Sequence, residues 1–172
     1  MNKLNVALII LIFSLPLIGG ERIEAESKNN TVALNPVFAP LGTVTMEYEH
    51  ACMSPKTSIG VSAWYEYKEV RARWIYAKAL YYPKGVALNG LALGCTMGVL
   101  RGYREENHDD QMKNDTTPIM GLMLQYNWFL GTDTKILLGI GMGGRVAIKN
   151  LSNDSPLPKY DGDVRMVMGY CF

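Results

Sequence analysis

Residues 88–103 read LNGLALGCTMGVLRGY and alternate between large and small side chains. The larger apolar residues occupy alternate positions, namely Leu91, Leu93, Cys95, Met97 and Val99. The positions between them hold Gly90, Ala92, Gly94, Thr96 and Gly98. Because successive side chains of a β-strand point to opposite faces, this period of two predicts a strand with one bulky apolar face and one small face.

The same alternation recurs along the rest of the chain. Further strands are predicted at residues 31–38, 43–49, 58–67, 70–82, 120–130, 136–148 and 164–172. Pro36 falls near the end of the first of these, where a strand tolerates proline. The faces of 70–82 are ambiguous, because Lys78 shares one face with Trp74 and Tyr76 while Arg73 shares the other with apolar residues.

The small face of these strands indicates the architecture. A soluble sandwich or lipocalin-like barrel turns its large apolar side chains inward and its polar side chains to water. Here the second face is mostly Gly, Ala, Ser and Thr with a few charges, which suits the crowded interior of a narrow barrel. The apolar faces then meet lipid, with Tyr and Trp near their ends. We therefore predict an all-β fold, an eight-stranded antiparallel up-and-down transmembrane β-barrel.

The connections between these strands alternate in length. Short links are expected at residues 53–56, 83–85 and 131–133, and two further short links at 39–41 and 68–70. Long polar links are expected at 105–117 and 149–163. An even number of strands with short turns on one side and longer loops on the other is typical of outer-membrane barrels.

The N-terminal segment reads as an export signal. After Lys3, residues 4–18 form the apolar run LNVALIILIFSLPLI, and Gly19 and Gly20 follow it. This order is typical of a secretory signal peptide, and the run is shorter than the roughly 20 residues that a transmembrane helix needs. We predict a signal peptide at residues 1–25, with cleavage after Gly20 or Ala25, and one barrel domain at residues 26–172.

The charge balance of the chain argues against one class of binding partner. The chain has 172 residues, 48% of them hydrophobic, and 17 Lys+Arg against 16 Asp+Glu give a net charge of +1. This balance argues against a nucleic-acid binder, which neutralises phosphates with excess positive charge. Three cysteines, Cys52, Cys95 and Cys171, are too few and odd in number for a disulfide framework.

The C-terminal residues resemble those of known proteins. A terminal Phe172 preceded by Tyr170 at alternating positions is similar to the closing strand of bacterial outer-membrane barrels. Other features in the same order are Leu34-Asn35-Pro36, Tyr48-Glu49, Tyr81-Tyr82-Pro83-Lys84-Gly85, Gln125-Tyr126-Asn127-Trp128 and Gly139-Ile140-Gly141-Met142-Gly143. Over residues 31–172 the chain thus resembles the small bacterial outer-membrane β-barrel superfamily (OmpA/OmpX-like barrels), and within it an uncharacterised domain family.

This resemblance implies a location and partners. The location is the outer membrane of a Gram-negative cell envelope, in contact with membrane lipid and lipopolysaccharide. Tyr170 and Phe172 would serve as the recognition signal for the barrel-assembly machinery. Outer loops would meet lipopolysaccharide, host ligands or other envelope proteins.

Charged residues on the small face form the candidate site. We expect an ionic network inside the barrel from Glu47, Glu49, Glu66, Arg145 and Arg165. An unpaired buried charge is costly, which favours pairing among them. A proton or ion path is the alternative, but the interior of an eight-stranded barrel is normally filled by side chains, so no pore is expected.

Two sequence motifs are considered as sites for a nucleotide cofactor or a metal ion. Residues 139–144, GIGMGG, match the dinucleotide fingerprint G-x-G-x-x-G, but strand alternation continues after them where the fingerprint needs a helix. The acidic stretch 105–110 includes His108, yet its spacing matches no calcium loop. We predict no cofactor and no metal.

The predicted function is a structural, adhesive or envelope-interaction role without catalysis. One alternative is a lipid A deacylase or acyltransferase, which needs a histidine beside a nucleophile. His50 and His108 are the two histidines, and no serine stands at a helpful spacing beside His50. Another alternative is a soluble exported barrel that binds a small apolar ligand.

Overall fold

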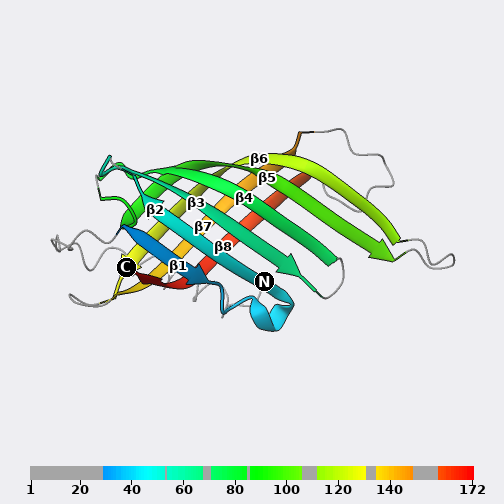
Figure 1. Ribbon diagram of the computed structural model, residues 1–172, viewed down its shortest axis with the longest axis horizontal. Coiled ribbons are helices and arrows are strands. Elements are labelled where there is room, and N and C mark those ends of the chain that lie inside the picture. Colours follow the sequence, from blue (N-terminus) through cyan, green and yellow to red (C-terminus); the bar gives the residue numbers. More distant parts are fainter. Residues whose placement is uncertain are drawn as a thin grey trace, which may run out of the picture.

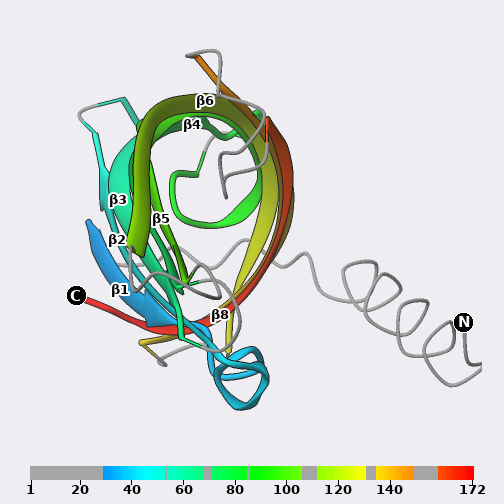
Figure 2. The ribbon, with the colours of Figure 1, turned by 90° about the vertical axis from the view of Figure 1, so that its right-hand side faces the viewer.

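A computed structural model describes residues 29–52, 54–67, 71–84, 86–105, 112–130, 135–148 and 159–172. Eight antiparallel strands form a closed barrel, in which each strand pairs with the next and the last pairs with the first (Figures 1 and 2). The predicted fold class is confirmed. The predicted signal peptide lies outside the described residues. No helix in the described part of the chain is long and apolar enough to cross a membrane.

The strands differ in length around the barrel. Their bounds are β1 Asn30–Leu34, β2 Thr43–Ala51, β3 Thr57–Glu66, β4 Arg71–Tyr81, β5 Gly90–Glu105, β6 Met112–Phe129, β7 Ile136–Ala147 and β8 Tyr160–Cys171. The end that carries Asn30 and Phe172 is called the terminal rim, and the opposite end is called the loop rim. The β5–β6 hairpin extends beyond its neighbours at the loop rim (Figure 1).

Three strand boundaries differ from the sequence prediction by four residues or more. The first strand ends at Leu34 and not at residue 38, because proline has no N–H for the ladder and the chain turns at Pro36. The Asn35 side-chain oxygen holds this turn by accepting hydrogen bonds from the N–H groups of Val37 and Phe38. A 3-10 helix, η2 (Ala39–Leu41), leads into β2.

Two strands begin earlier than predicted. β6 starts at Met112, so that part of the expected 105–117 loop is strand, and β8 starts at Tyr160 and not at residue 164. In β6 the ladder with β5 continues to the Glu105–Met112 pair. Residues 113–117 read KNDTT and are all polar, so this part of β6 gives no hydrophobic alternation to detect.

The predicted alternation of faces is confirmed on β2, β3, β5, β6, β7 and β8, and on β4, where the faces were ambiguous, Trp74, Tyr76 and Lys78 point inward. Outward positions hold large apolar side chains, of which Leu122, Val164 and Met97 are 73%, 66% and 65% exposed. Inward positions hold small, polar or charged side chains, together with buried apolar residues such as Trp74, Leu80 and Val167. The barrel is therefore apolar outside, whereas its inside holds both charges and apolar layers.

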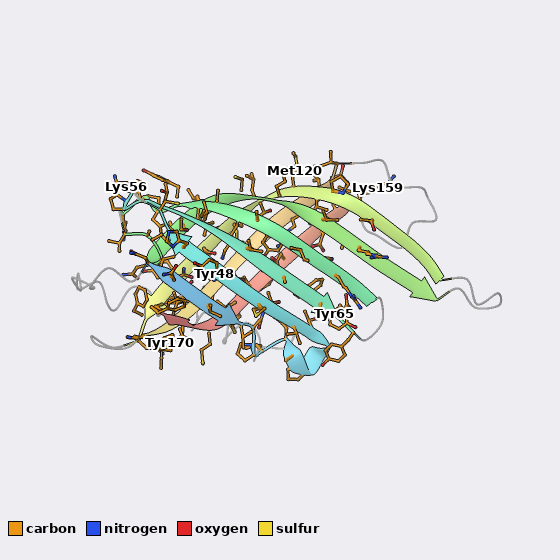
Figure 3. The ribbon with its side chains drawn as sticks, in the orientation of Figure 1. Tyr48, Lys56, Tyr65, Met120, Lys159 and Tyr170 are labelled. Atoms are coloured by element: carbon orange, nitrogen blue, oxygen red, sulfur yellow. The ribbon has the colours of Figure 1, made fainter. Side chains whose placement is uncertain are left out.

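Aromatic side chains mark both limits of the apolar outer face. Tyr126 and Trp128 pack with ring centroids 4.7 Å apart toward the terminal rim, and Tyr65 and Tyr67 lie toward the loop rim. Figure 3 shows Tyr170 and Tyr65 at opposite ends of the barrel. From Leu91 to Arg101 on β5, about 33 Å of strand at a tilt near 40° spans about 25 Å along the barrel axis.

Glycines on the inner face stand opposite the longest inward side chains. Registered pairs are Gly60–Lys78, Gly98–Tyr76, Gly121–Arg145 and Gly141–Arg165. A Cβ atom added at Gly98 would lie 2.2 Å from the Ile75 carbonyl oxygen and 2.5 Å from Tyr76 Cβ. The small residues predicted on the inner face thus leave the space that the large interior side chains occupy.

Substituting Gly98→Ala should therefore destabilise the barrel by about 1–3 kcal/mol, as overpacking of a filled interior does. Gly144→Ala is the matched control, because a Cβ at Gly144 meets nothing within 4 Å. Urea unfolding of the detergent-folded protein, followed by the gel shift between folded and unfolded forms, measures the difference. Equal stability of the two variants would contradict this packing account.

Candidate functional site

Four charged side chains meet in the middle of the barrel, and we call them the buried charge quartet: Glu47, Glu49, Lys78 and Arg165. The Lys78 Nζ atom lies 2.8 Å from Glu47 Oε2 and 2.9 Å from Glu49 Oε2. The Arg165 Nε–H donates to both Glu47 carboxylate oxygens at 2.9 Å. Two carboxylates and two cations make the quartet neutral, with each member at most 5% exposed.

Neutral polar groups surround the quartet and complete its hydrogen bonds. Glu49 Oε1 accepts from the Ser58 hydroxyl at 2.6 Å and from the Tyr82 hydroxyl at 2.5 Å. Gln125 Nε2 donates to Glu49 Oε2 at 3.3 Å. Because a buried charge needs both a counter-charge and hydrogen bonds, these groups offset the loss of water around the carboxylate.

A second cluster lies nearer the loop rim, around Arg145. Its guanidinium donates to the Asp163 carboxylate and lies 3.7 Å from Asp161 Oδ2. The same guanidinium stands 4.2 Å from the Tyr76 ring centroid and 4.9 Å from that of Trp74. Arg145 is thus held by two carboxylates and two aromatic faces.

The predicted site residues fall into three places. Glu47, Glu49 and Arg165 come together in the quartet, while Arg145 belongs to the separate cluster. Glu66 ends β3 on the inner face and belongs to neither cluster of described ion pairs.

Sequence reasoning missed Lys78 and the two aspartates. The faces of 70–82 were ambiguous because Lys78 shares a face with the bulky residues Trp74 and Tyr76, and in the structure all three point inward. Asp161 and Asp163 fell in the predicted 149–163 loop, and the structure places them at the start of β8.

Side chains fill the barrel above and below the quartet. Toward the terminal rim lies an apolar layer that includes Leu80, Tyr82, Met123, Leu137 and Val167. Toward the loop rim, Trp74 packs with Leu100 and Ile119. A void beside Glu47, Trp74 and Arg165 holds about 10 Å³, which is room for about one water.

The residues considered for catalysis and ligand binding are placed as follows. His50 Nδ1 lies 2.8 Å from Asn30 Oδ1, which also accepts a hydrogen bond from the Tyr48 hydroxyl. Ser58, on the strand next to His50, points into the barrel toward Glu49. His108 lies outside the described residues. The GIGMGG motif lies within β7, so no helix follows it.

Possible metal ligands and the three cysteines are placed as follows in the described residues. Among them, no group of three His, Cys, Asp or Glu side chains is arranged to hold a metal ion. Residues 106–110 of the acidic stretch are not among those described. Cys52, Cys95 and Cys171 form no disulfide bond with one another.

The C-terminal residues close the barrel against β1. Phe172 and Asn30 exchange two backbone hydrogen bonds of 3.0 Å. The Tyr170 and Phe172 rings both face outward, stacked with centroids 6.5 Å apart. Lys135 Nζ lies 5.7 Å from the Tyr170 ring centroid. This arrangement leaves an aromatic pair exposed at the terminal rim.

Substituting Lys78→Met should destabilise the barrel by about 3–5 kcal/mol, because it leaves two buried carboxylates with one cation. The double variant Glu49→Gln/Lys78→Met keeps the Glu47–Arg165 pair neutral and should recover much of that loss. Glu66→Gln, outside both clusters, should change stability by about 0.5 kcal/mol or less. Urea titration of each folded variant measures its free energy of unfolding. A double variant no more stable than Lys78→Met would contradict the neutral quartet.

Comparison with known proteins identifies the fold. No protein-family model matches the sequence, and no curated protein does. The structure is similar to the crystal structure of the N-terminal β-barrel domain of Pseudomonas aeruginosa OprF, with a TM-score of 0.52 and 14% sequence identity. The match covers 84% of this chain and 96% of the OprF domain. At this identity the similarity shows a shared small-barrel fold.

Proposed function

We propose that the protein is an integral outer-membrane β-barrel with a structural, adhesive or envelope-interaction role, without a pore and without catalysis. The observation that carries this proposal is the distribution of side chains between the two faces. Charges are paired inside the barrel, and the outer face is apolar between its rims.

The outer face fits a bilayer better than it fits water. Leu122, Val164 and Met97 are each about two-thirds exposed or more. Soluble monomers rarely expose apolar patches larger than a few hundred Å². An apolar band about 25 Å tall with aromatic girdles is the property of outer-membrane barrels. The soluble ligand-binding barrel is therefore disfavoured.

The interior supports a structural role. Layers of buried side chains lie on both sides of the quartet, and the quartet's charges are bound to one another. The described histidine, His50, is hydrogen bonded to Asn30 on the outer face, away from the inward Ser58. These contacts favour a scaffold over a lipid-modifying enzyme.

The orientation that we propose places the terminal rim in the periplasm and the loop rim outside. Residues 1–25 direct export, and the outward Tyr170 and Phe172 present the signal for the barrel-assembly machinery. The loop rim then meets lipopolysaccharide or other envelope and host ligands.

The expressed protein should sediment with outer membranes, require detergent for extraction and migrate differently on gels before and after boiling. This follows because the folded barrel resists detergent and its apolar belt needs lipid. Cell fractionation followed by unboiled and boiled electrophoresis measures both properties. Recovery in the soluble fraction without detergent would contradict the proposal.

Replacing Phe172→Ala should lower the amount of folded barrel in the outer membrane several-fold, because the assembly machinery loses its recognition residue while the backbone pairing with Asn30 remains. Tyr160→Ala is the matched control, since Tyr160 is an exposed aromatic at the other end of the same strand. Gel electrophoresis of membrane fractions without boiling measures the amounts of folded and unfolded protein for each variant. Equal assembly of both variants would argue against Phe172 as the signal.

A further inference from the structure

We propose that β8 of the folded barrel binds an extended segment of a partner polypeptide, which pairs with its open edge as an added antiparallel strand. The open edge lies at Val164 and Met166, and we call it the β8 edge. This inference rests on the proposed outer-membrane location, because the bilayer is what makes an unpaired strand edge unfavourable.

β1 covers only the end of β8 that lies near the terminal rim (Figure 1). β1 has five residues and β8 has twelve, and the ladder between them ends at the Leu34–Met168 pair. The turn that follows β1 pairs with β2 instead, because the Asn35 N–H donates to the Thr45 carbonyl. Beyond Met168 toward the loop rim, β8 therefore has β7 on one side and no described strand on the other.

Every second residue of β8 turns its backbone groups toward the uncovered side. Phe172 exchanges two backbone hydrogen bonds with β1, whereas the Cys171 N–H donates to the Lys135 carbonyl on the β7 side. Because backbone groups of a paired strand alternate between its two edges, Val164 and Met166 face the same way as Phe172. Among the described residues, none pairs with their N–H and C=O groups there.

The β8 edge lies at the depth of the bilayer hydrocarbon. On the same strand, the exposed Tyr160 lies four residues from Val164 toward the loop rim, and the exposed Tyr170 lies four residues from Met166 toward the terminal rim. The Val164 side chain points outward and is 66% exposed. Water is absent at this depth, so unpaired N–H and C=O groups need a partner that is itself in the membrane.

The covered part of the same edge shows which kind of occupant it takes. There β1 lies against β8 as an antiparallel strand, with its outward residues Val32 and Leu34 paired to Tyr170 and Met168. A further strand in line with β1 would continue this ladder and offer both donors and acceptors at the right spacing. An acyl chain offers neither, so lipid leaves the β8 edge unsatisfied.

A small void behind the β8 edge is lined by unpaired donors as well. The void of about 10 Å³ reaches Val164 on β8 and Thr45 on β2. Trp74 and Arg145 also line it and are at most 6% exposed, and the described residues give their Nε1 and Nη1 atoms no hydrogen-bond partner. An added strand would direct alternate side chains inward, where a short one with an acceptor oxygen, such as serine, matches these donors.

A second copy of the chain does not fit the β8 edge. At this depth a second copy offers its own β8 edge, and two antiparallel β8 strands would place one barrel upside down in the membrane. Strands of such barrels tilt by about 40°, so two parallel β8 edges would incline the barrel axes by about 80°. The occupant is therefore a segment of a different polypeptide, with apolar residues outward and small or polar residues inward.

The test measures binding of a labelled peptide to the detergent-folded chain by fluorescence anisotropy. The peptide copies β7 (Ile136–Ala147), which already pairs antiparallel with the other edge of β8 and alternates apolar with small residues. Two analogues differ only in which backbone nitrogens are methylated. One is methylated at the positions of Leu138, Ile140 and Met142, and the other at those of Gly139, Gly141 and Gly143.

The first analogue should bind at least about tenfold more weakly than the unmethylated peptide, because it loses the donors that face the β8 edge. In an added strand with its apolar side chains outward, the apolar residues turn their N–H groups to β8, as Val32 and Leu34 of β1 do. The second analogue should bind like the unmethylated peptide, since its methyl groups lie on the opposite edge.

A pair of chain variants tests the same contact from the barrel side. Val164→Pro removes an N–H from the β8 edge and leaves the β7 ladder intact, and strand edges tolerate proline. Val164→Ala keeps the N–H and shortens the side chain. The proline variant should bind the unmethylated peptide several-fold more weakly, whereas the alanine variant should bind it like the unmodified chain. The gel shift of unboiled samples shows that both variants are folded.

Equal binding of the two methylated analogues to the unmodified chain would overturn the proposal, and that comparison needs no variant to fold. An equal loss in Val164→Pro and Val164→Ala would also overturn it, because it would show side-chain docking without backbone pairing. A protein that fractionates with outer membranes but binds none of the peptides refutes this site and leaves the proposed function standing. A protein that is soluble without detergent refutes the proposed function itself.

Discussion

The narrow space inside eight strands is the constraint on which the rest of this structure depends. Several of the long inward side chains stand opposite a glycine, as Lys78 does to Gly60 and Arg165 to Gly141. Those long side chains carry charge, and a charge in so confined an interior must be paired. The result is a neutral quartet in the middle of the barrel, held by polar groups around it and by packed layers on both sides.

The arrangement of the outer face follows from this interior. Most large apolar side chains of the strands point outward, and those that point inward pack in layers on both sides of the quartet. The wall that results is uneven, since alanines on β4 lie between bulkier residues of the neighbouring strands. One pattern of alternating residue size therefore produces both the packed interior and the apolar belt.

Most of the fold could be predicted from the sequence, because alternation with a period of two reports directly on the faces of a strand. The prediction failed where this alternation is absent or mixed. Polar residues at the start of β6 are held in the ladder by backbone hydrogen bonds, and Pro36 ended β1 earlier than expected. The candidate site was predicted in part: Lys78 was left undecided, and Asp161 and Asp163 were assigned to a loop.

The central claim is that the apolar outer face of the folded barrel is covered by lipid, and Cys95 reports on it most directly. This free thiol is exposed in the middle of the outer face, whereas Cys171 is buried. The measurement is the reaction of a Cys52→Ser variant, folded in lipid vesicles, with a charged water-soluble maleimide. The account predicts no labelling until the protein is unfolded, when both remaining thiols react. Rapid labelling of Cys95 in the folded, vesicle-bound protein would contradict it.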